Sequence, residues 1–228
     1  MKKIAVAIDG PGGAGKSTIS KEIAKRLGII YVDTGALYRT VGLYVSEQGV
    51  DPHNAESVAA LLPDIHIEVR YEDGVQCVYL NGINPGDRIR TPQMSMYASA
   101  VSAIPAVRAF LLDTQKDIAR KNSVIMDGRD IGTVILPNAD LKVFMTASPE
   151  CRARRRYDEL VAKGQNVSFE DVLREMNERD HQDSTREIAP AEAAADAVVL
   201  DNTGMTVDES ADAVIALLEE RTAKEAAR

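Results

Sequence analysis

Residues 10–17 read GPGGAGKS, which fits the pattern G-x-x-x-x-G-K-[ST] of a phosphate-binding loop. The apolar run 4–8 comes directly before this loop, and a run with helical periodicity, 17–27, follows it. A strand, a glycine-rich loop and a helix in this order turn backbone N–H groups and the positive end of the helix toward a phosphate. A chance glycine-rich turn would not require these flanking elements, so the stretch predicts a nucleoside triphosphate site.

Two side chains of the loop carry specific chemistry. Lys16 is expected to reach the β- and γ-phosphates, and the hydroxyl of Ser17 is expected to ligate Mg²⁺. The residues predicted to hold the nucleotide here are Gly10, Pro11, Gly12, Gly13, Ala14, Gly15, Lys16, Ser17 and Thr18.

The bulk composition describes one acidic domain. The chain has 228 residues and a formal net charge of -8, and it is long enough for one well-buried core. Nucleic-acid binding needs a clustered excess of Lys and Arg, so this balance disfavours it and indicates that the arginines bind something smaller. Cys77 and Cys151 lack metal-site spacing, and no apolar run reaches the length of a membrane span. These features predict a cytoplasmic protein without a disulfide or a membrane partner.

Five short apolar runs bounded by turn residues predict buried strands. They lie at 4–8, 29–32, 123–126, 141–145 and 197–200. Helical patterns separate them, which favours an α/β fold with a parallel sheet covered on both faces. Ligands of such sheets bind at the carboxyl ends of the strands, and the polar motifs fall there.

A stretch of different character lies between the second and third runs. Apolar and polar residues alternate over 65–71, Asp73-Gly74 predicts a hairpin into 75–80, and Asn81-Gly82 predicts a turn into a short third strand. His66 occupies a polar position of this pattern, which favours a solvated side chain over a catalytic one. We expect an inserted antiparallel β subdomain over 63–103, with helices beginning at Pro92 and Pro105.

Charged motifs follow the second and third predicted strands. DTGALYR, at 33–39, places Thr34 and Arg39 near the loop, although a helix cap with a surface arginine would give the same pattern. In DGRD, at 127–130, Asp127 is the candidate for holding Mg²⁺ or its waters. Arg129 and Asp130 would project into the same crevice, unless they form an internal ion pair.

Two further segments are rich in arginine. RARRR, at 152–156, lies on a helix that begins at Ser148-Pro149, and it fits a solvated face, a nucleic-acid patch or a phosphate clamp. In ERDHQDSTR, at 178–186, Arg179, Asp183 and Arg186 share one face of a predicted helix, where an ordinary salt-bridged surface is the alternative.

These motifs, in this order and with the insert between the second and third strands, resemble the bacterial cytidylate kinases over nearly the whole chain. The resemblance implies a single P-loop kinase domain, 1–228, with a five-stranded parallel sheet of order 2-3-1-4-5, an inserted monophosphate-binding β subdomain and a short helical lid over 150–165. It also implies ATP and Mg²⁺ as cofactors, and CMP and dCMP as the acceptors of the γ-phosphoryl group.

The resemblance further assigns roles to residues by motif. It implies that Lys16, Arg129 and Asp127 are catalytic. The acceptor phosphate would bind Arg39, Arg129 and Arg186; the sugar would neighbour Arg179 and Asp183; the base would be read by Ser99, Arg108 and Asp130. Thr34 stands where relatives often have Ser, so the hydroxyl is retained with an extra methyl group. Arg154, Arg155 and Arg156 match the lid arginines as a group, as ligands of ATP.

Other functions fit part of the sequence. Another P-loop kinase acting on UMP or AMP would share the loop, and so would a nucleotide-gated binding module. The chain has no N-K-x-D guanine-reading sequence, and arginines that converge on one crevice suit a second phosphate substrate. We therefore expect a monomeric small-molecule kinase rather than a switch.

Overall fold

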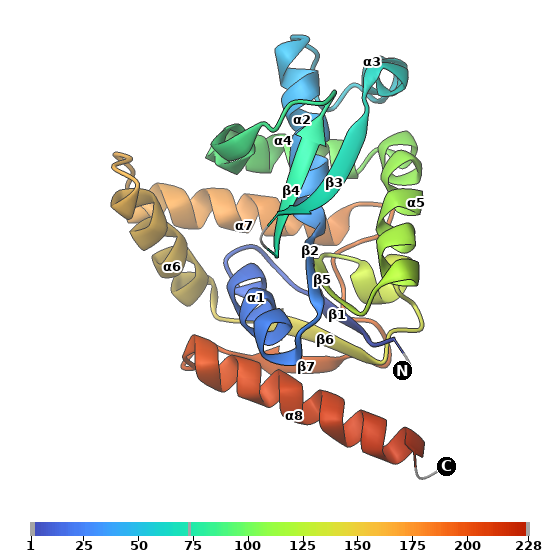
Figure 1. The fold of residues 1–228 in the computed structure, drawn as a ribbon. Helices are drawn as coiled ribbons and strands as arrows, with labels where there is room; N and C mark the ends of the chain where they lie inside the picture. Colours follow the sequence, from blue (N-terminus) through green and yellow to red (C-terminus); the bar gives the residue numbers. More distant parts are fainter. Residues whose placement is uncertain (1–2, 73, 227–228) are drawn as a thin grey trace.

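The computed structural model describes residues 3–72 and 74–226, and it contains a five-stranded parallel sheet (Figure 1). Its strands are β1 (Ala5–Asp9), β2 (Ile30–Asp33), β5 (Val124–Gly128), β6 (Leu141–Thr146) and β7 (Val198–Asp201). They lie in the order β2-β5-β1-β6-β7, and every neighbouring pair is parallel. Counted along the chain, this is the predicted order 2-3-1-4-5, so the predicted fold class is confirmed.

Both faces of the sheet are covered by helices because its central strands are apolar on both sides. On one face, α1 (Lys16–Leu27) and α8 (Val207–Ala226) pack Ile23 and Val214 against Ile8. On the other face, α5 (Pro105–Lys121) and the turn η3 (Ile131–Ile135) cover Met126. The polar carboxyl ends of all five strands consequently meet at one edge of the sheet.

The phosphate loop leaves β1 at a position that only glycine can occupy. Gly10 has a φ of +142°, and a Cβ there would lie 1.9 Å from the carbonyl oxygen of Met145 on β6. The loop therefore runs flush against the neighbouring strand before it turns into α1.

The predicted insert contains the expected hairpin, but the prediction of a third strand was wrong. β3 (Ile67–Glu72) and β4 (Val75–Leu80) pair in an antiparallel manner; Gly74, at φ +77°, takes part in the turn, and Asp73 lies outside the described residues. After Asn81 and Gly82, the described chain makes one isolated bridge, Leu80 to Ile83, and then the short helix η2 (Gly86–Arg90). The preceding Pro85 has no N–H for a ladder, and helical φ and ψ at that residue start η2 instead.

Helices join the hairpin to the rest of the chain. They are α2 (Thr34–Glu47), α3 (Ala55–Leu61), η1 (Leu62–Asp64) and α4 (Pro92–Ser102). α4 begins as predicted, with Thr91 capping the N–H of Met94 and proline in the first turn. One apolar cluster joins Leu37 of α2, Val78 of β4, Val101 of α4 and Leu111 of α5, so the hairpin packs on the same helices that border the sheet.

Two helices, α6 (Pro149–Ala162) and α7 (Phe169–Thr185), project beside the crevice and pack on each other through Leu160 and Val172. Ser148 and Ser168 cap them. The expectation that Arg186 continues the helical face of Arg179 and Asp183 was wrong. α7 ends at Thr185, and Arg186 takes an extended ψ of 143°.

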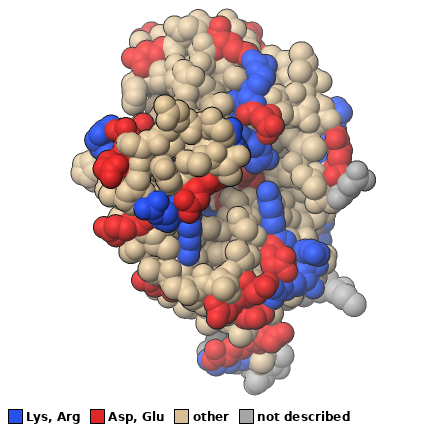
Figure 2. All heavy atoms as spheres, turned by 90° about the vertical axis from the view of Figure 1, so that its left-hand side faces the viewer, with Lys and Arg blue, Asp and Glu red and all other residues tan. Residues whose placement is uncertain are grey.

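Charges of both signs intermingle on the side of the molecule that carries α6 (Figure 2). Cys77 and Cys151 are both free thiols. Over residues 3–72 and 74–226, no single helix is long and apolar enough to cross a membrane, although Pro92–Ser102 and Pro105–Lys121, bent by 100°, meet the criterion as a pair.

Candidate active site

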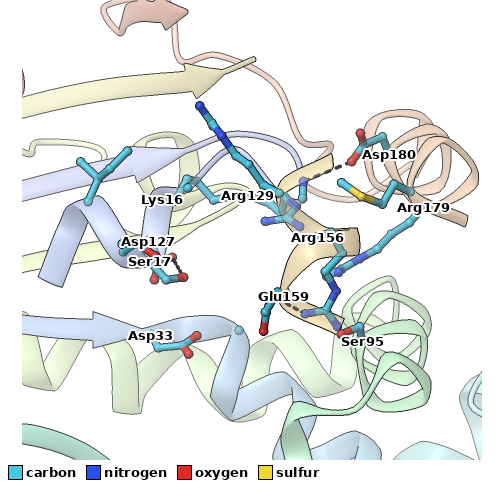
Figure 3. A pocket seen from close by; sticks show the side chains of 18 of the residues that line it. Lys16, Ser17, Asp33, Ser95, Asp127, Arg129, Arg156, Glu159, Arg179 and Asp180 are labelled. Carbon is cyan, nitrogen blue, oxygen red and sulfur yellow. Dashed lines mark hydrogen bonds and ion pairs between the residues drawn. The ribbon is translucent and has the colours of Figure 1, made fainter. Parts of the chain in front are cut away.

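A cavity of about 700 Å³ opens at the carboxyl edge of the sheet, between the phosphate loop, α4 and the α6–α7 pair (Figure 3). The predicted site residues that line it are Gly12, Gly13, Gly15, Lys16, Ser17, Thr18, Arg39, Asp127, Arg129, Arg155, Arg156 and Arg179. Residues far apart in the sequence thus meet where the polar motifs predicted a crevice.

Lys16 is a buried cation at the floor of this cavity. Lys16 is only 6% exposed, and its Nζ donates to the carbonyl of Pro11 at 2.7 Å. Burial and then the charge of Arg129 lower the pKa of Lys16, and although the charge of Asp127 opposes them, the pKa falls to about 7. An anionic phosphate would therefore stabilise the charged form of Lys16 strongly.

Ser17 and Asp127 provide a pair of hard oxygen donors. Ser17 Oγ donates to Asp127 Oδ2 at 2.6 Å, and the hydroxyl of Tyr31 donates to Oδ1 at 2.9 Å. Burial and the nearby charge of Asp33 raise the pKa of Asp127. No cluster of three or more His, Cys, Asp or Glu side chains that could hold a metal occurs in the described part of the chain. The Ser17–Asp127 pair nevertheless fits Mg²⁺, which takes few protein ligands and completes its shell with phosphate and water.

The motif after β2 is both a helix cap and part of the crevice. Asp33 accepts the N–H of Ala36 and also binds Arg39 at 2.8 Å. Asp33 and Arg39 both line the cavity, so Arg39 is not the surface arginine of the alternative interpretation. The hydroxyl of Thr34 donates to the carbonyl of Asp127 at 2.7 Å, outside the cavity lining. Thr34 therefore joins the start of α2 to β5.

Two arginines from different elements converge on Asp183. Arg129 Nε lies 2.9 Å and Arg179 Nε lies 3.8 Å from Asp183 Oδ2, while Ser99 Oγ donates to Oδ1 at 2.7 Å. Burial and the charge of Arg129 lower the pKa of Arg179 to about 10. Within the described residues, Arg39 Nε and Arg179 Nε are buried without a hydrogen-bond partner. This group of cations has donors left for an anion.

The residues that the resemblance assigns to the base are only partly brought together. Arg108 and Asp130 form an ion pair with side chains 10% and 6% exposed, and Arg186 NH2 lies 3.9 Å from Asp130. Arg186 also donates to Ser102 Oγ at 2.8 Å. Arg108, Asp130 and Arg186 lie outside the cavity lining, and Ser99 binds Asp183 instead of joining them. The internal ion pair weighed for Asp130 is present, with Arg108 as its partner.

The three lid arginines have three different surroundings. Arg154 stacks on the rings of Tyr157 and Phe169, 5.3 and 4.4 Å from their centroids, and lies outside the cavity lining. Arg155 and Arg156 line the cavity. Arg155 binds Asn202 through Oδ1 at 3.1 Å and through the carbonyl at 2.9 Å, whereas Arg156 pairs with Glu159 at 2.7 Å.

Sequence reasoning missed several residues that shape the site. Asn202 Nδ2 donates to the carbonyl of Ala14 in the loop, and Gln76 of β4 hydrogen-bonds the backbone of Asp33. Arg152 and Asp180 both bind Gly12. Their partners cannot be read from the local sequence, because each contact spans dozens of positions. RARRR includes Arg152 and ERDHQDSTR includes Asp180, but neither residue was assigned a role at the loop.

Taken together, the fold and the site define a P-loop phosphotransferase with room for a second anionic substrate. A solved structure of an uncharacterized protein from Eubacterium ventriosum is similar in fold, with a TM-score of 0.52 at 13% identity over 95% of this chain and 99% of that one. A model of the family described as "Cytidylate kinase" matches residues 6–220.

Relatives named cytidylate kinase are similar over almost their full length. That of Caldicellulosiruptor bescii is 49% identical over 95% of this chain and 96% of its own. That of Geobacter sulfurreducens is 50% identical over 95% of this chain and 93% of its own. The chain belongs to the cytidylate kinase family.

Proposed function

We propose that the protein transfers the γ-phosphoryl group of ATP to CMP or dCMP and releases ADP with CDP or dCDP. The observation that carries this proposal is one crevice in which a phosphate loop faces Arg39, Arg129 and Arg179. A loop for the donor phosphates and a second set of cations for an acceptor phosphate suit a kinase whose two substrates are both anionic.

This reaction needs little acid–base chemistry from the protein. The second pKa of a phosphate monoester is about 6, so the attacking oxygen of the acceptor is already ionised near neutrality. The difficulty is to hold two anionic groups in line, which makes catalysis a matter of positioning and charge neutralisation. Lys16 would neutralise the transferring group, and Arg129 and Arg39 would neutralise and orient the acceptor phosphate.

Mg²⁺ belongs to the proposal as well. Ser17 Oγ and the Asp127 carboxylate are the residues that would hold it or its waters, and it would screen the charge between the β- and γ-phosphates. Tyr31 fixes the carboxylate of Asp127 in this orientation through its hydrogen bond to Oδ1.

Base choice would depend on Asp130, Arg108 and Ser99. Cytosine offers an amino donor beside ring acceptors, so a carboxylate and a guanidinium favour it over uracil, which has a carbonyl at the amino position. The Arg108–Asp130 pair is buried and outside the cavity lining, so its side chains would turn toward the crevice to meet a base. Arg186 would join Arg39 and Arg129 at the acceptor phosphate, with Arg179 and Asp183 beside the sugar.

We propose that the β insert over 63–103 and the lid over 150–165 are the parts that close over the substrates and exclude water.

A coupled assay of ADP release tests the proposal. With ATP and Mg²⁺, the protein is expected to turn over with CMP and dCMP far faster than with UMP, AMP or GMP. Turnover with UMP or AMP alone would assign a different acceptor. Slow hydrolysis that no acceptor stimulates would indicate a binding module. We further propose a cytoplasmic monomer that acts on small molecules without a nucleic-acid or membrane partner, and light scattering after gel filtration measures its oligomeric state.

A further inference from the structure

The backbone of Gly12, in the phosphate loop, is held by side chains of α6 and α7 at both its N–H and its carbonyl. Its N–H donates to Asp180 Oδ1 at 3.2 Å, and its carbonyl accepts from Arg152 NH1 at 2.9 Å. Arg152 and Asp180 also form an ion pair with each other. Figure 3 shows Asp180 beside Arg179 on α7, at the wall of the cavity. The three residues close a ring of polar contacts that holds two successive peptide groups of the loop, Pro11–Gly12 through its N–H and Gly12–Gly13 through its carbonyl.

The Arg152–Asp180 pair is shielded from solvent. The side chain of Arg152 is 7% exposed and that of Asp180 is 20% exposed. A buried guanidinium is costly unless its donors are used, and Arg152 uses them on the carbonyls of Ala147 and Gly12 and on the Asp180 carboxylate. Unlike an exposed ion pair, this shielded and hydrogen-bonded pair holds the side chains of Arg152 and Asp180 in one geometry.

The next loop residue packs directly on the same helices. Gly13 has a φ of +71°, and a Cβ there would lie 2.6 Å from Met176 Cε and 2.9 Å from the carbonyl oxygen of Arg152. α6 and α7 therefore contact the loop at two successive residues. Any displacement of these helices has to move the loop or break these contacts.

We propose that Arg152 and Asp180 are positioning residues for the ATP site. They hold the two peptide groups on either side of the Gly12 Cα so that the amides after it stay turned toward the phosphates, and they join the loop to the helices that carry Arg155 and Arg179. A preorganised set of donors binds an anion without first paying to reorganise. This inference rests on the proposed function, because it takes ATP as the ligand of the loop.

The proposal predicts that changes at Asp180 weaken the binding of ATP and leave the binding of CMP almost unchanged. Asp180→Ala removes the acceptor of the Gly12 N–H, so the Kd for the β,γ-imido analogue of ATP with Mg²⁺ should rise on the order of tenfold. The KM for CMP, measured at saturating ATP, should stay within about twofold because the acceptor arginines keep their partners. Asp180→Asn retains an acceptor oxygen and should lose less affinity than Asp180→Ala.

Two further variants complete the design. Arg152→Lys keeps a cation but cannot span three acceptors, so it should weaken the analogue about as much as Asp180→Ala. Arg174→Ala is the matched control, because Arg174 forms an exposed ion pair with Asp171 on the same helix. It should bind the analogue like the wild-type protein. Calorimetric titration of the analogue needs no acceptor, so a wild-type protein that binds it but does not phosphorylate CMP would refute the proposed function alone.

Wild-type affinity for the analogue in both Asp180→Ala and Arg152→Lys would overturn the inference. An equal loss of ATP and CMP affinity would also overturn it, since the pair would then support the whole crevice. If Asp180→Ala does not fold, Asp180→Asn and Arg152→Lys decide by the same comparison of the two substrates.

Discussion

At the scale of single residues, Lys16 is notable because its charge depends on its surroundings. In the protein alone, burial and Arg129 hold its pKa at about 7, below the 10.5 of an ordinary lysine. Phosphate oxygens next to Nζ would favour the ammonium form and raise that pKa again. The residue would therefore be largely neutral before ATP binds at pH 8 and charged afterwards.

This dependence predicts that ATP binding at pH 8 takes up close to one proton. Lys16 gains the proton as its pKa rises through that pH, while ATP is already ionised. Calorimetry in buffers with different heats of ionisation measures the uptake. Lys16→Met should abolish it, whereas Lys25→Met, at an exposed position of α1, should leave it unchanged. Binding without proton uptake in the wild-type protein would show that Lys16 is charged throughout.

Asp130 gives a second prediction at this scale. If its carboxylate accepts from the cytosine amino group, Asp130→Ala removes a charge-assisted bond worth roughly 1.5 to 3 kcal/mol to CMP and relieves repulsion of uracil. The ratio of kcat/KM for CMP to that for UMP should then fall at least ~tenfold. Because both substrates are measured on one variant, a loss of stability from unpairing Arg108 cancels in the ratio.

The control for Asp130 is Asp113→Ala, which removes an exposed carboxylate of α5. It should leave the ratio unchanged. Equal losses for CMP and UMP in Asp130→Ala would mean that the Arg108–Asp130 pair is structural and does not read the base.

At the scale of elements, the amide side chain of Gln76 joins the β3–β4 hairpin to the sheet. Gln76 Oε1 accepts the N–H of Asp33 at 2.7 Å, and Gln76 Nε2 donates to the carbonyl of Asp33 at 3.2 Å. Gln76 thus extends the edge of β2 by one ladder-like pair of hydrogen bonds. Asp33 in turn binds Arg39, so the hairpin supports a proposed ligand of the acceptor phosphate.

Gln76→Ala should therefore impair use of CMP more than use of ATP. Losing about 1 kcal/mol of positioning corresponds to a roughly fivefold higher KM for CMP, with the KM for ATP unchanged. The melting temperature should fall by about 2 °C for a domain of this size. Glu68→Gln, which removes an exposed pair with Arg70 from the same hairpin, is the control. A rise in the KM for ATP alone would contradict the prediction.

At the scale of the whole molecule, Asp9 connects stability to pH. It ends β1, is 4% exposed, and accepts the backbone N–H groups of Ile131 and Gly132 at 2.7 Å each. Burial raises its pKa from 3.8 to about 6. Between these values the folded protein retains a proton that the unfolded chain releases, so this residue's contribution to stability falls as pH rises.

The difference between the wild-type protein and Asp9→Asn isolates that contribution. Going from pH 4 to pH 7, the free energy of unfolding of the wild-type protein should decline relative to the variant by about 2.4 kcal/mol. Urea unfolding at a series of pH values measures it. Parallel curves for the two proteins would show that Asp9 titrates alike in the folded and unfolded chains.

The strands and the phosphate loop could be predicted because their signals are local. The motif GPGGAGKS by itself indicates the backbone conformation of the loop. The apolar runs predicted each of the five sheet strands to within two residues at either end. The prediction of a third strand in the insert was wrong because Pro85 leads into a short helix, where the preceding turn had favoured a strand. The roles of Arg152, Asp180 and Gln76 were missed because their partners lie far away in the sequence, and only the folded chain shows which of many similar polar side chains meet.

The position of β5 between β2 and β1 has a consequence for how the protein is made. The ribosome delivers β1, the loop and β2 first, yet neither strand has its neighbour until Val124–Gly128 emerges, and Gly10 packs against Met145 still later. Until then the apolar strand β1 remains unpaired in the nascent chain. A gene fragment that ends before residue 124 would encode the whole glycine-rich motif and yet produce no nucleotide site.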